Sequence, residues 1–494
     1  MTSRTAMNGQ EEPRPKHLWI GGSWRSGADG QTFTATSPST GRAIGTLQRG
    51  TAEDVDAAVR AARAAFNDYR LLPVWERAAI CERIAQLILE NEAHLAAVVS
   101  ADQGKPLHRE ALPEVRKAAT GYRNAAAHVK HLYGQTIPVE DPHKRVSTVR
   151  QPRGVYAVVT PWNAPVNIPT EYLAPALATG NTVVWIPAPS TSLCAVALAE
   201  ILEEAGVPPG VINLVTGEGS VVGDAAVAHP DVDAVGFTGS VTTGRHIAHR
   251  AAGKAQLLEL GGNGPTIVFA DANLELAAEA IAAASFTNAG QICSASEVVL
   301  VERSIQAELG ALVAALAQER RLGAPEDPGT SLGPLNNHDV ADKMDRHIAD
   351  AVDLGARVLT GGGRAPGRPT ENYYEPTVLT GVPRDATLFA EESFGPIAPL
   401  TPFDDIAEVL EALQSRQFGL ASAVWTRNMG RAMRVAEAAR TGTVVINGPS
   451  TYWELHLPFG GGSGTSSGLG RIGGLQTLEA MTDLKTISVD LRGF

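Results

Sequence analysis

Residues 154–165, with the sequence GVYAVVTPWNAP, decide the fold class, because a regular alternation of strands and helices begins here. Residues 155–160 form a short apolar run that is typical of a buried strand, and a Pro-punctuated helix is expected to follow it as far as Ala178. The same pattern then repeats, with strands expected at 182–186, 211–215 and 233–237 and helices at 193–205, from 221 and at 243–252. Strands that alternate with helices at this spacing predict an α/β fold with a parallel sheet.

The residues before this stretch predict helices. Thr51, followed by Glu53 and Asp54, has the hydroxyl cap and the acidic first turn of a helix start. Apolar residues then recur at three- and four-residue spacing to Phe66, and two further helices are expected at 75–99 and 112–132. We therefore expect the first quarter of the chain to be largely helical.

The alternation resumes after Gly261-Gly262, where we predict a domain boundary. Its expected strands lie at 266–269, 298–301, 421–425 and 443–446. Two alternating segments, 145–149 and 485–491, lie outside this pattern and are candidates to pair with each other. Two such strands projecting together would suit contacts between subunits.

The composition excludes several classes of function. The net charge is −12 and no Lys/Arg block is present, so a nucleic-acid partner is not expected. No apolar run approaches the ~20 residues that a membrane span needs. The polar residues 1–16 lack the apolar core of a signal peptide and predict a frayed tail. The three cysteines are far apart in the sequence, which favours a reduced, cytoplasmic protein over a disulfide framework.

Cys293 lies in the segment FTNAGQICS, residues 286–294, between a helical pattern and a β-branched run. Small and polar residues around it permit the close approach of a ligand. A single cysteine is more often buried and inert, so this residue alone decides nothing. Cys81 and Cys194 are interpreted as packing residues, and the twelve histidines form no ligand-spaced cluster, so no metal is expected.

Two glycine-containing turns follow predicted strands and open helices. The first, GEGSVVG at 217–223, contains Gly219, and the second, FTGS at 237–240, contains Gly239 and Ser240. Glycines allow a close backbone approach to a pyrophosphate, and a helix start supplies N–H groups. Each turn alone is a weak signal, but two at adjacent strand ends favour a nucleotide crevice.

Two further side chains could carry chemistry. Glu259 adjoins the paired glycines at the predicted boundary, where a buried carboxylate could act as a general base, although a surface acid beside a hinge is the simpler interpretation. Asn163 follows a strand and could donate to an oxyanion, although Asn is also common in turns.

Six motifs follow one another along the chain: PWN (161–163), FTGS (237–240), ELGG (259–262), GQIC (290–293), EESFGP (391–396) and PFGG (458–461). Their order resembles the aldehyde dehydrogenase superfamily over nearly the whole chain. The resemblance implies a Rossmann-like cofactor domain, an α/β catalytic domain and a small β bridging element that pairs subunits into homodimers or homotetramers. The implied domains are 1–132 with 153–261 for the cofactor, 262–460 for catalysis, and 133–152 with 476–494 for oligomerisation.

The resemblance also implies roles for individual residues. Cys293 would attack the aldehyde carbonyl, Asn163 and the Cys293 main-chain N–H would hold the oxyanion, and Glu259 would activate the hydrolytic water. Hydride would pass to NAD, with NADP possible. The residues implied to contact the cofactor are Trp162, Gly219, Gly239, Ser240, Leu260, Glu392 and Phe394.

Three departures from the family pattern bear on these roles. Ile186 and Pro189 stand where the family has a Lys and a Glu that contact the adenosine ribose, so the preference between NAD and NADP stays open, with NAD expected. Tyr172 replaces a common Lys, which removes the support for a proton relay at that position. The loop 462–466 is longer than usual and has no Lys.

The expected substrate is an aromatic or medium-sized uncharged aldehyde. Ala164, which is often bulky in the family, leaves room in the tunnel, and Tyr452, Trp453 and His456 precede the PFGG motif near the expected entrance. Two alternatives remain: a coenzyme A-acylating semialdehyde dehydrogenase, against which Glu259 argues, and a catalytically silent cofactor-binding homologue, against which the combination of Cys293, Glu259 and Asn163 argues.

Overall fold

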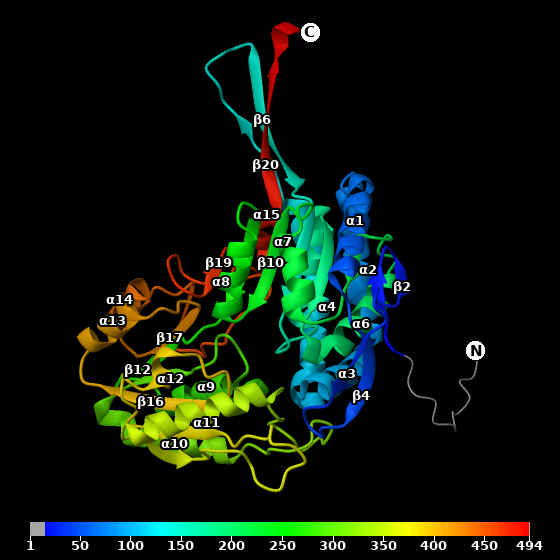
Figure 1. The fold of residues 1–494 in the computed structure, drawn as a ribbon. Helices are drawn as coiled ribbons and strands as arrows, with labels where there is room; N and C mark the ends of the chain where they lie inside the picture. Colours follow the sequence, from blue (N-terminus) through cyan, green and yellow to red (C-terminus); the bar gives the residue numbers. More distant parts are fainter. Residues whose placement is uncertain (1–14, 494) are drawn as a thin grey trace, which may run out of the picture.

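The computed structural model describes residues 15–493, which form two large sheets flanked by helices and a narrow sheet that projects away from both (Figure 1). The predicted N-terminal tail lies mostly outside the described residues. Lys16, however, bridges to Leu47 and forms an ion pair with Glu200, so the predicted tail is wrong at this residue.

The first sheet has the strand order β19-β11-β10-β7-β8-β9-β1-β2. Its parallel strands are β7 (Val155–Thr160), β8 (Thr182–Pro187), β9 (Ile212–Leu214), β10 (Ala234–Gly239) and β11 (Ala255–Leu260). Antiparallel strands complete it at both edges: β1 (Leu18–Ile20), β2 (Ser23–Arg25) and β19 (Gly468–Leu469). The predicted parallel α/β sheet is confirmed, whereas its antiparallel edges and β11 were not predicted.

Helices cover both faces of this sheet. One face carries α1 (Ala52–Tyr69), α7 (Asp224–Ala228) and α8 (Val241–Arg250), and the other carries α2 (Val74–Glu90), α3 (Glu92–Gln103), α4 (Leu112–His128), α5 (Asn167–Thr179) and α6 (Ser192–Glu204), with α15 (Gly474–Ala480) against α4 and α5. Along β7, Val155 and Ala157 pack on the first face, whereas Tyr156 and Val158 pack on the second. This alternation buries both faces, as a parallel sheet requires.

The first quarter differs from its prediction in two respects. The single helix expected at 75–99 is two helices, because the Asn91 side chain donates to the Leu87 carbonyl and α2 ends there. The chain also forms strands before α1, including the separate hairpin of β3 (Thr32–Thr36) and β4 (Ala43–Gln48). The capping of α1 is confirmed, since Thr51 and Asp54 form a reciprocal capping box.

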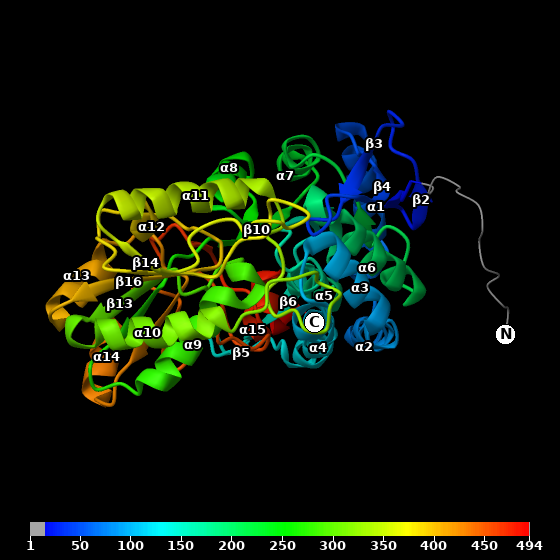
Figure 2. The ribbon, with the colours of Figure 1, turned by 90° about the horizontal axis from the view of Figure 1, so that it is seen from below.

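The second sheet has the order β14-β15-β16-β13-β12-β17-β18 and is parallel except for β14. Its strands are β12 (Pro265–Val268), β13 (Val298–Glu302), β14 (Arg357–Thr360), β15 (Thr377–Thr380), β16 (Ile397–Phe403), β17 (Ala421–Trp425) and β18 (Thr443–Ile446). Its helices are α9 (Leu274–Phe286), α10 (Gln306–Gln318), α11 (His338–Asp353), α12 (Thr387–Ala390), α13 (Ile406–Ser415) and α14 (Met429–Ala438). Helices α10 and α11 lie on opposite sides of this sheet (Figure 2).

Short 3-10 or π-helical turns join several of these elements. They are Leu107–Ala111, Val129–His131, Pro189–Thr191, Gly219–Gly223, Thr287–Gly290, Arg303–Ile305 and Leu491–Gly493. The chain passes from the first sheet to the second between Leu260 and Pro265, beside the predicted boundary. The division into domains remains a prediction.

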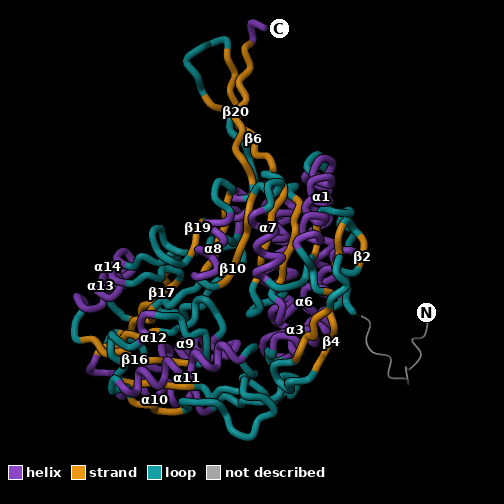
Figure 3. Tube along the Cα trace, viewed as in Figure 1, coloured by secondary structure: helices purple, strands orange, loops and turns teal. Residues whose placement is uncertain are grey.

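The projecting sheet, here called the arm, has the order β20-β6-β5 and consists of β5 (Thr136–Ile137), β6 (Lys144–Pro152) and β20 (Thr482–Asp490). Arg145 pairs with Val489 and Val149 with Lys485, which confirms the predicted pairing of the two segments. Figures 1 and 3 show the arm extending beyond the helices. In the described part of the chain, every helix is too short or too polar to cross a lipid bilayer.

Candidate active site

Three neighbouring strands of the first sheet bring predicted site residues to one edge. Asn163 follows β7, Gly239 ends β10 and Glu259 lies near the end of β11, and these strands are adjacent and parallel. The carboxyl ends of parallel strands are where α/β sheets bind ligands. Cys293 reaches this edge from the second sheet, on the loop between α9 and β13.

The loop before Cys293 has an unusual backbone. Asn288, Ala289 and Gly290 all have positive φ, at 53°, 52° and 74°. Gly290 permits a close approach that no side chain allows, because a Cβ there would lie 1.9 Å from the Gly395 carbonyl oxygen. Left-handed conformations cost a non-glycine residue roughly 1 kcal/mol or more, so the surrounding contacts must hold this turn.

Two cavities meet at the predicted catalytic residues, since Asn163, Glu259 and Cys293 line both. The larger cavity has a volume of about 390 Å³ and opens past Ala164 and Trp453. The smaller has a volume of about 180 Å³ and extends towards Gly239 and Ser240. The three side chains thus lie where a molecule in one cavity would meet a molecule in the other.

Burial controls the acid–base properties of Cys293 and Glu259. Burial, reinforced by the neighbouring Glu259, holds the pKa of the Cys293 thiol well above its ordinary value. Burial raises the pKa of Glu259 to about 8, although hydrogen bonding with Cys293 opposes this rise. The Glu259 side chain is 3% exposed, and its Oε1 has no hydrogen-bond partner among the described residues. A carboxyl with a pKa near the operating pH can accept and release a proton readily.

Asn163 is held in place by the same loop that carries Cys293. Its Nδ2 donates to the Gln291 carbonyl at 3.1 Å, and its own carbonyl accepts from Asn288 Nδ2 at 2.9 Å. An amide nitrogen has two hydrogens, so one remains for a ligand. The main-chain N–H of Cys293 also has no hydrogen-bond acceptor within residues 15–493.

The smaller cavity contains most of the residues predicted to contact the cofactor. Trp162 and Phe394 form an edge-to-face pair with ring centroids 5.5 Å apart. Glu392 accepts from the Gly262 N–H at 3.0 Å, and burial raises the pKa of this carboxyl to about 7. Ser240 caps α8 by accepting from the Thr243 N–H. The structure therefore brings Trp162, Gly239, Ser240, Glu392 and Phe394 together.

Two predicted cofactor residues do not line this cavity. Leu260 is 5% exposed and belongs to an apolar cluster between the first sheet and α8, where a Cβ added to Gly244 would meet its side chain. Gly219 begins the turn before α7, and a Cβ there would meet no atom within 4 Å. The backbone at Gly219 is therefore accessible, and a ligand could approach it closely.

The replacements at Tyr172 and Ile186 are accommodated structurally. The Tyr172 hydroxyl donates to the Phe237 carbonyl at 2.9 Å and shares a hydrogen bond with Thr238 Oγ1, and burial raises its pKa well above the ordinary value. It is thus a fixed donor at the end of β10. Ile186 is fully buried in the apolar cluster beside α1 and offers no polar group.

The lengthened loop at 462–466 is followed directly by residues that pair with the strand that carries Glu259. Ser467, which follows it, donates from Oγ to the Gly261 carbonyl at 2.8 Å and accepts from the Gly419 N–H at 2.9 Å. Gly468 pairs with Glu259 in the antiparallel contact of β19 with β11. Ser467 and Gly468, rather than a Lys in the loop, therefore contact the strand that carries Glu259.

Sequence reasoning missed several residues of the site. Glu297 accepts from the N–H groups of Ser393 and Phe394 at 2.6 Å each and so orients the EESFGP segment. Lys343, on α11, lines the smaller cavity, and Glu171 and Lys117 line the larger. None of these residues lies in a recognisable sequence motif. Among residues 15–493, no group of three or more His, Cys, Asp or Glu side chains could hold a metal ion.

Comparison with known proteins gives the family. Residues 24–487 match the model of the aldehyde dehydrogenase family. The chain is 40% identical to glutarate-semialdehyde dehydrogenase of Pseudomonas putida, over 96% of this chain and 98% of that protein. It is 38% identical to the Escherichia coli succinate-semialdehyde dehydrogenase [NADP(+)] GabD, over 96% and 97%.

Solved structures agree with this assignment. The betaine aldehyde dehydrogenase of Staphylococcus aureus, in complex with NAD+, superimposes with a TM-score of 0.93 and 32% identity, over 96% of this chain and 95% of that chain. A family model that matches most of the chain and relatives that are similar along their whole length lead to the same conclusion. The chain belongs to the aldehyde dehydrogenase family of oxidoreductases.

Proposed function

We propose that the protein oxidises an aldehyde to the carboxylic acid by covalent catalysis at Cys293, with a nicotinamide dinucleotide as hydride acceptor and water as the final acyl acceptor. One observation carries this proposal: Cys293, Glu259 and Asn163 lie together where two cavities meet. The larger cavity would hold the aldehyde and the smaller the nicotinamide. Family membership supplies the reaction class, and the geometry supplies the residues.

The smaller cavity fits a nicotinamide ribose. Glu392 is a half-buried carboxyl that could accept hydrogen bonds from ribose hydroxyls, and Trp162 and Phe394 offer aromatic walls for a flat ring. Gly239 and Ser240 at the start of α8 are suited to a diphosphate. Bound there, an oxidised nicotinamide supplies the acceptor for the hydride of the aldehyde carbon.

The first step would form a bond between Cys293 Sγ and the carbonyl carbon. Because burial keeps the thiol protonated, its proton must pass to a base, and the Glu259 carboxylate is the neighbouring group that can take it. The carbonyl electron pair moves to the oxygen, which the free Asn163 N–H and the Cys293 main-chain N–H would stabilise. By analogy with hydrolases, each such donor contributes about 3 kcal/mol.

The second step would hydrolyse the thioester that remains after hydride has left. Glu259 takes a proton from water, the water oxygen attacks the acyl carbon, and the carbon–sulfur bond breaks. The Cys293 thiolate then recovers a proton and the acid departs. The unpartnered Oε1 of Glu259 is the oxygen suited to this task. Since Glu259 is present, water rather than coenzyme A is the proposed acceptor.

The uncharged aldehyde expected from the sequence stays a prediction, and the charges in the larger cavity favour a second candidate, an aldehyde with a distant carboxylate. Arg109 and Lys117 line the cavity and form no ion pair within the described residues. The three unpaired carboxyl groups there, Glu110, Glu171 and Glu259, are acids whose pKa values burial raises to about 7, about 8 and about 8. The cavity is therefore net positive near neutral pH. Two relatives are named for semialdehydes.

We also propose that the arm pairs this chain with a second copy in a homodimer or homotetramer. Leu484, Ile487 and Val149 are exposed apolar residues on a sheet that extends beyond the body of the molecule. The proposed domains remain 1–132 with 153–261, 262–460, and 133–152 with 476–494. Cytoplasmic location also remains a prediction.

A panel assay tests the function and separates its alternatives. Benzaldehyde, hexanal, succinic semialdehyde and glutaric semialdehyde are each supplied with NAD or NADP, with and without coenzyme A. We expect NAD(P)H and free acid without coenzyme A. A strict need for coenzyme A would establish the acylating alternative, and no turnover with any pair would favour the silent homologue. Lys117→Met should lower kcat/KM for the semialdehydes and leave that for hexanal almost unchanged.

A further inference from the structure

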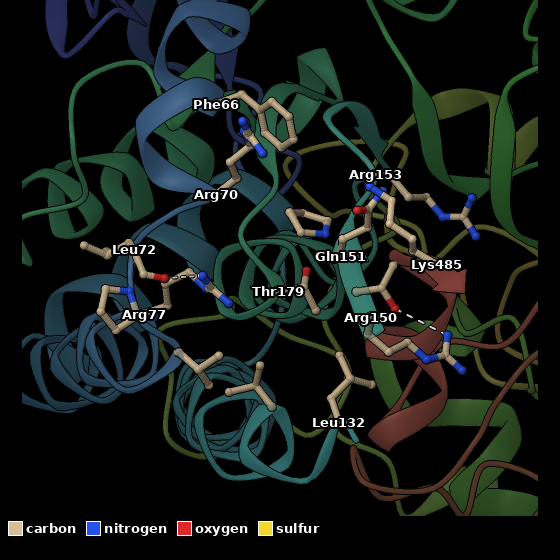
Figure 4. A pocket seen from close by; sticks show the side chains of 15 residues that line it. Phe66, Arg70, Leu72, Arg77, Leu132, Arg150, Gln151, Arg153, Thr179 and Lys485 are labelled. Atoms are coloured by element: carbon tan, nitrogen blue, oxygen red, sulfur yellow. Dashed lines mark hydrogen bonds between the residues drawn. The ribbon is translucent and has the colours of Figure 1, made fainter. Parts of the chain in front are cut away.

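A third cavity of about 580 Å³ lies at the base of the arm and shares no lining residue with the two cavities of the candidate active site. Its wall comes from the end of α1, the start of α2, the end of α5 and the arm strands β6 and β20. Figure 4 shows its side chains around an open centre beside Thr179. We call it the arm pocket.

The arm pocket is lined by basic side chains and, among the described residues, by no acidic one. The basic residues are Arg70, Arg77, Arg150, Arg153 and Lys485. Arg150 and Arg153 have carboxylate partners, Glu479 at 3.7 Å and Asp483 at 2.7 Å. Within residues 15–493, the other three basic residues form no ion pair, so the pocket keeps an excess of positive charge.

Arg77 is a buried positive charge that lacks a carboxylate partner among the described residues. It is 7% exposed, and its guanidinium donates only to main-chain carbonyls, those of Ala178 at 2.9 Å and Leu72. Burial lowers the pKa of Arg77, which reflects the cost of holding the charge away from water. A buried charge without a counter-charge is unfavourable, and an anion in the pocket would relieve that cost.

Apolar side chains lie among the basic ones, with Phe66 beside Arg70 and Leu72 beside Arg77 (Figure 4). Val74 and Leu132 also line the pocket. The volume lies within the range of small-molecule sites. Guanidinium groups match phosphate oxygens in geometry as well as in charge.

We propose that the arm pocket binds an organic phosphate of nucleotide size, with its phosphates among Arg70, Arg77 and Lys485 and its apolar part against Phe66. The site is separate from the proposed reaction, so its test does not depend on turnover. Because the arm strands β6 and β20 form part of the pocket, a bound ligand would contact the arm directly. The ligand chemistry is that of a phosphate-bearing anion with a flat apolar group.

Calorimetric titration of the full chain with pyrophosphate and with adenosine diphosphate tests the proposal. Arg70 and Lys485 are exposed, and within residues 15–493 their side chains form no hydrogen bond or ion pair, so the double variant Arg70→Gln, Lys485→Gln should fold. We expect it to weaken pyrophosphate binding by about tenfold or more, as loss of hydrogen bonds to a charged group predicts. The matched control Arg357→Gln, an exposed Arg on β14, should leave binding unchanged. Binding to the smaller cavity of the candidate active site should be insensitive to all three substitutions, because none of the three residues lines it.

The second part of the experiment tests the contribution of the adenosine group. Adenosine diphosphate should bind more tightly than pyrophosphate, and Phe66→Ser should remove that gain without affecting pyrophosphate. Identical isotherms for the wild type and the double variant would overturn the proposal. It would also be overturned if the double variant changed only the oligomeric state in sedimentation velocity, because the pocket would then accept a carboxylate from a second copy.

Discussion

The side-chain amide of Asn288 donates a 2.9 Å hydrogen bond to the main-chain carbonyl of Asn163. It also donates to the Gln291 carbonyl at 3.1 Å, and its Oδ1 accepts from Gln103 at 3.2 Å. These contacts join the loop that carries Cys293 to the strand end that carries the proposed oxyanion donor. The relative position of nucleophile and donor therefore depends on the Asn288 side chain, which also lines the larger cavity.

Removal of this side chain should separate the two groups. Asn288→Gly keeps the left-handed backbone but loses the hydrogen bonds, so we expect a loss of about 2 kcal/mol in the free energy of unfolding. We also expect kcat to fall by at least tenfold, with the KM for the cofactor almost unchanged, in steady-state kinetics and denaturant titration. The matched control is Ala289→Gly, which relieves the strain of a φ of 52°. It should retain activity and gain up to ~1 kcal/mol; equal losses in both variants would contradict this role.

The raised pKa of Glu259 predicts that replacing this residue increases stability and decreases activity. Because the pKa of this carboxyl is about 8 in the folded protein against an ordinary 4.5, folding is increasingly opposed as the pH rises from about 4.5 to 8. Glu259→Gln should therefore be more stable than the wild type at pH 8, by ~1 kcal/mol or more, and similar at pH 4.5. Denaturant titration at the two pH values measures this difference.

The same variant should lose turnover, and wild-type kcat/KM should rise between pH 7 and pH 9 as the basic form accumulates. A stability difference that does not change with pH would contradict the burial of Glu259 as the cause. Retained steady-state hydrolysis in Glu259→Gln would contradict its role as base.

Tyr172 should behave as a structural donor. Tyr172→Phe leaves the Phe237 carbonyl and Thr238 Oγ1 without this partner, so we expect a loss of about 1–2 kcal/mol in the free energy of unfolding. Because the pKa of this hydroxyl lies well above its ordinary value, the pH profile of kcat should keep its shape. A profile that loses a limb in Tyr172→Phe would instead show that the hydroxyl relays a proton.

The arm predicts concentration-dependent assembly. Leu484 and Ile487 are 56% and 41% exposed on β20, and lysines at both positions should repel a second copy. We expect Leu484→Lys, Ile487→Lys to sediment as a smaller species than the wild type. Leu276→Lys, on α9 and 52% exposed, is the control and should leave the assembly unchanged. If both variants sediment like the wild type, the arm is not the interface.

The parallel strands were predictable because β-branched runs such as β7 and β13 are buried and short. Strand β11 escaped prediction because Ala255–Leu260 contains no β-branched residue and its leucines and alanine favour helices. The pairing of β6 with β20 was predictable from two alternating segments that had no other partner.

The residues of the candidate site that lie in the ordered motifs were predictable from the sequence, and the other residues were not. Lys343 lines the smaller cavity and Glu297 orients the EESFGP segment through tertiary contacts, and their own neighbours in sequence carry no signal. The charge balance of the larger cavity depends on which acids are buried, as with Glu171, and only the folded chain determines that. Burial is thus the property that the sequence conveys least well here.

The most direct test of the account is the rate of NAD(P)H formation by Cys293→Ala with the best aldehyde from the panel, measured beside the circular dichroism spectrum of the same sample. Removal of the sulfur leaves both cavities and the Asn163 contact to Gln291 in place, so the fold should persist. We expect an unchanged spectrum and a fall in turnover of about 10³-fold or more. Turnover equal to that of the wild type in a folded Cys293→Ala protein would contradict it.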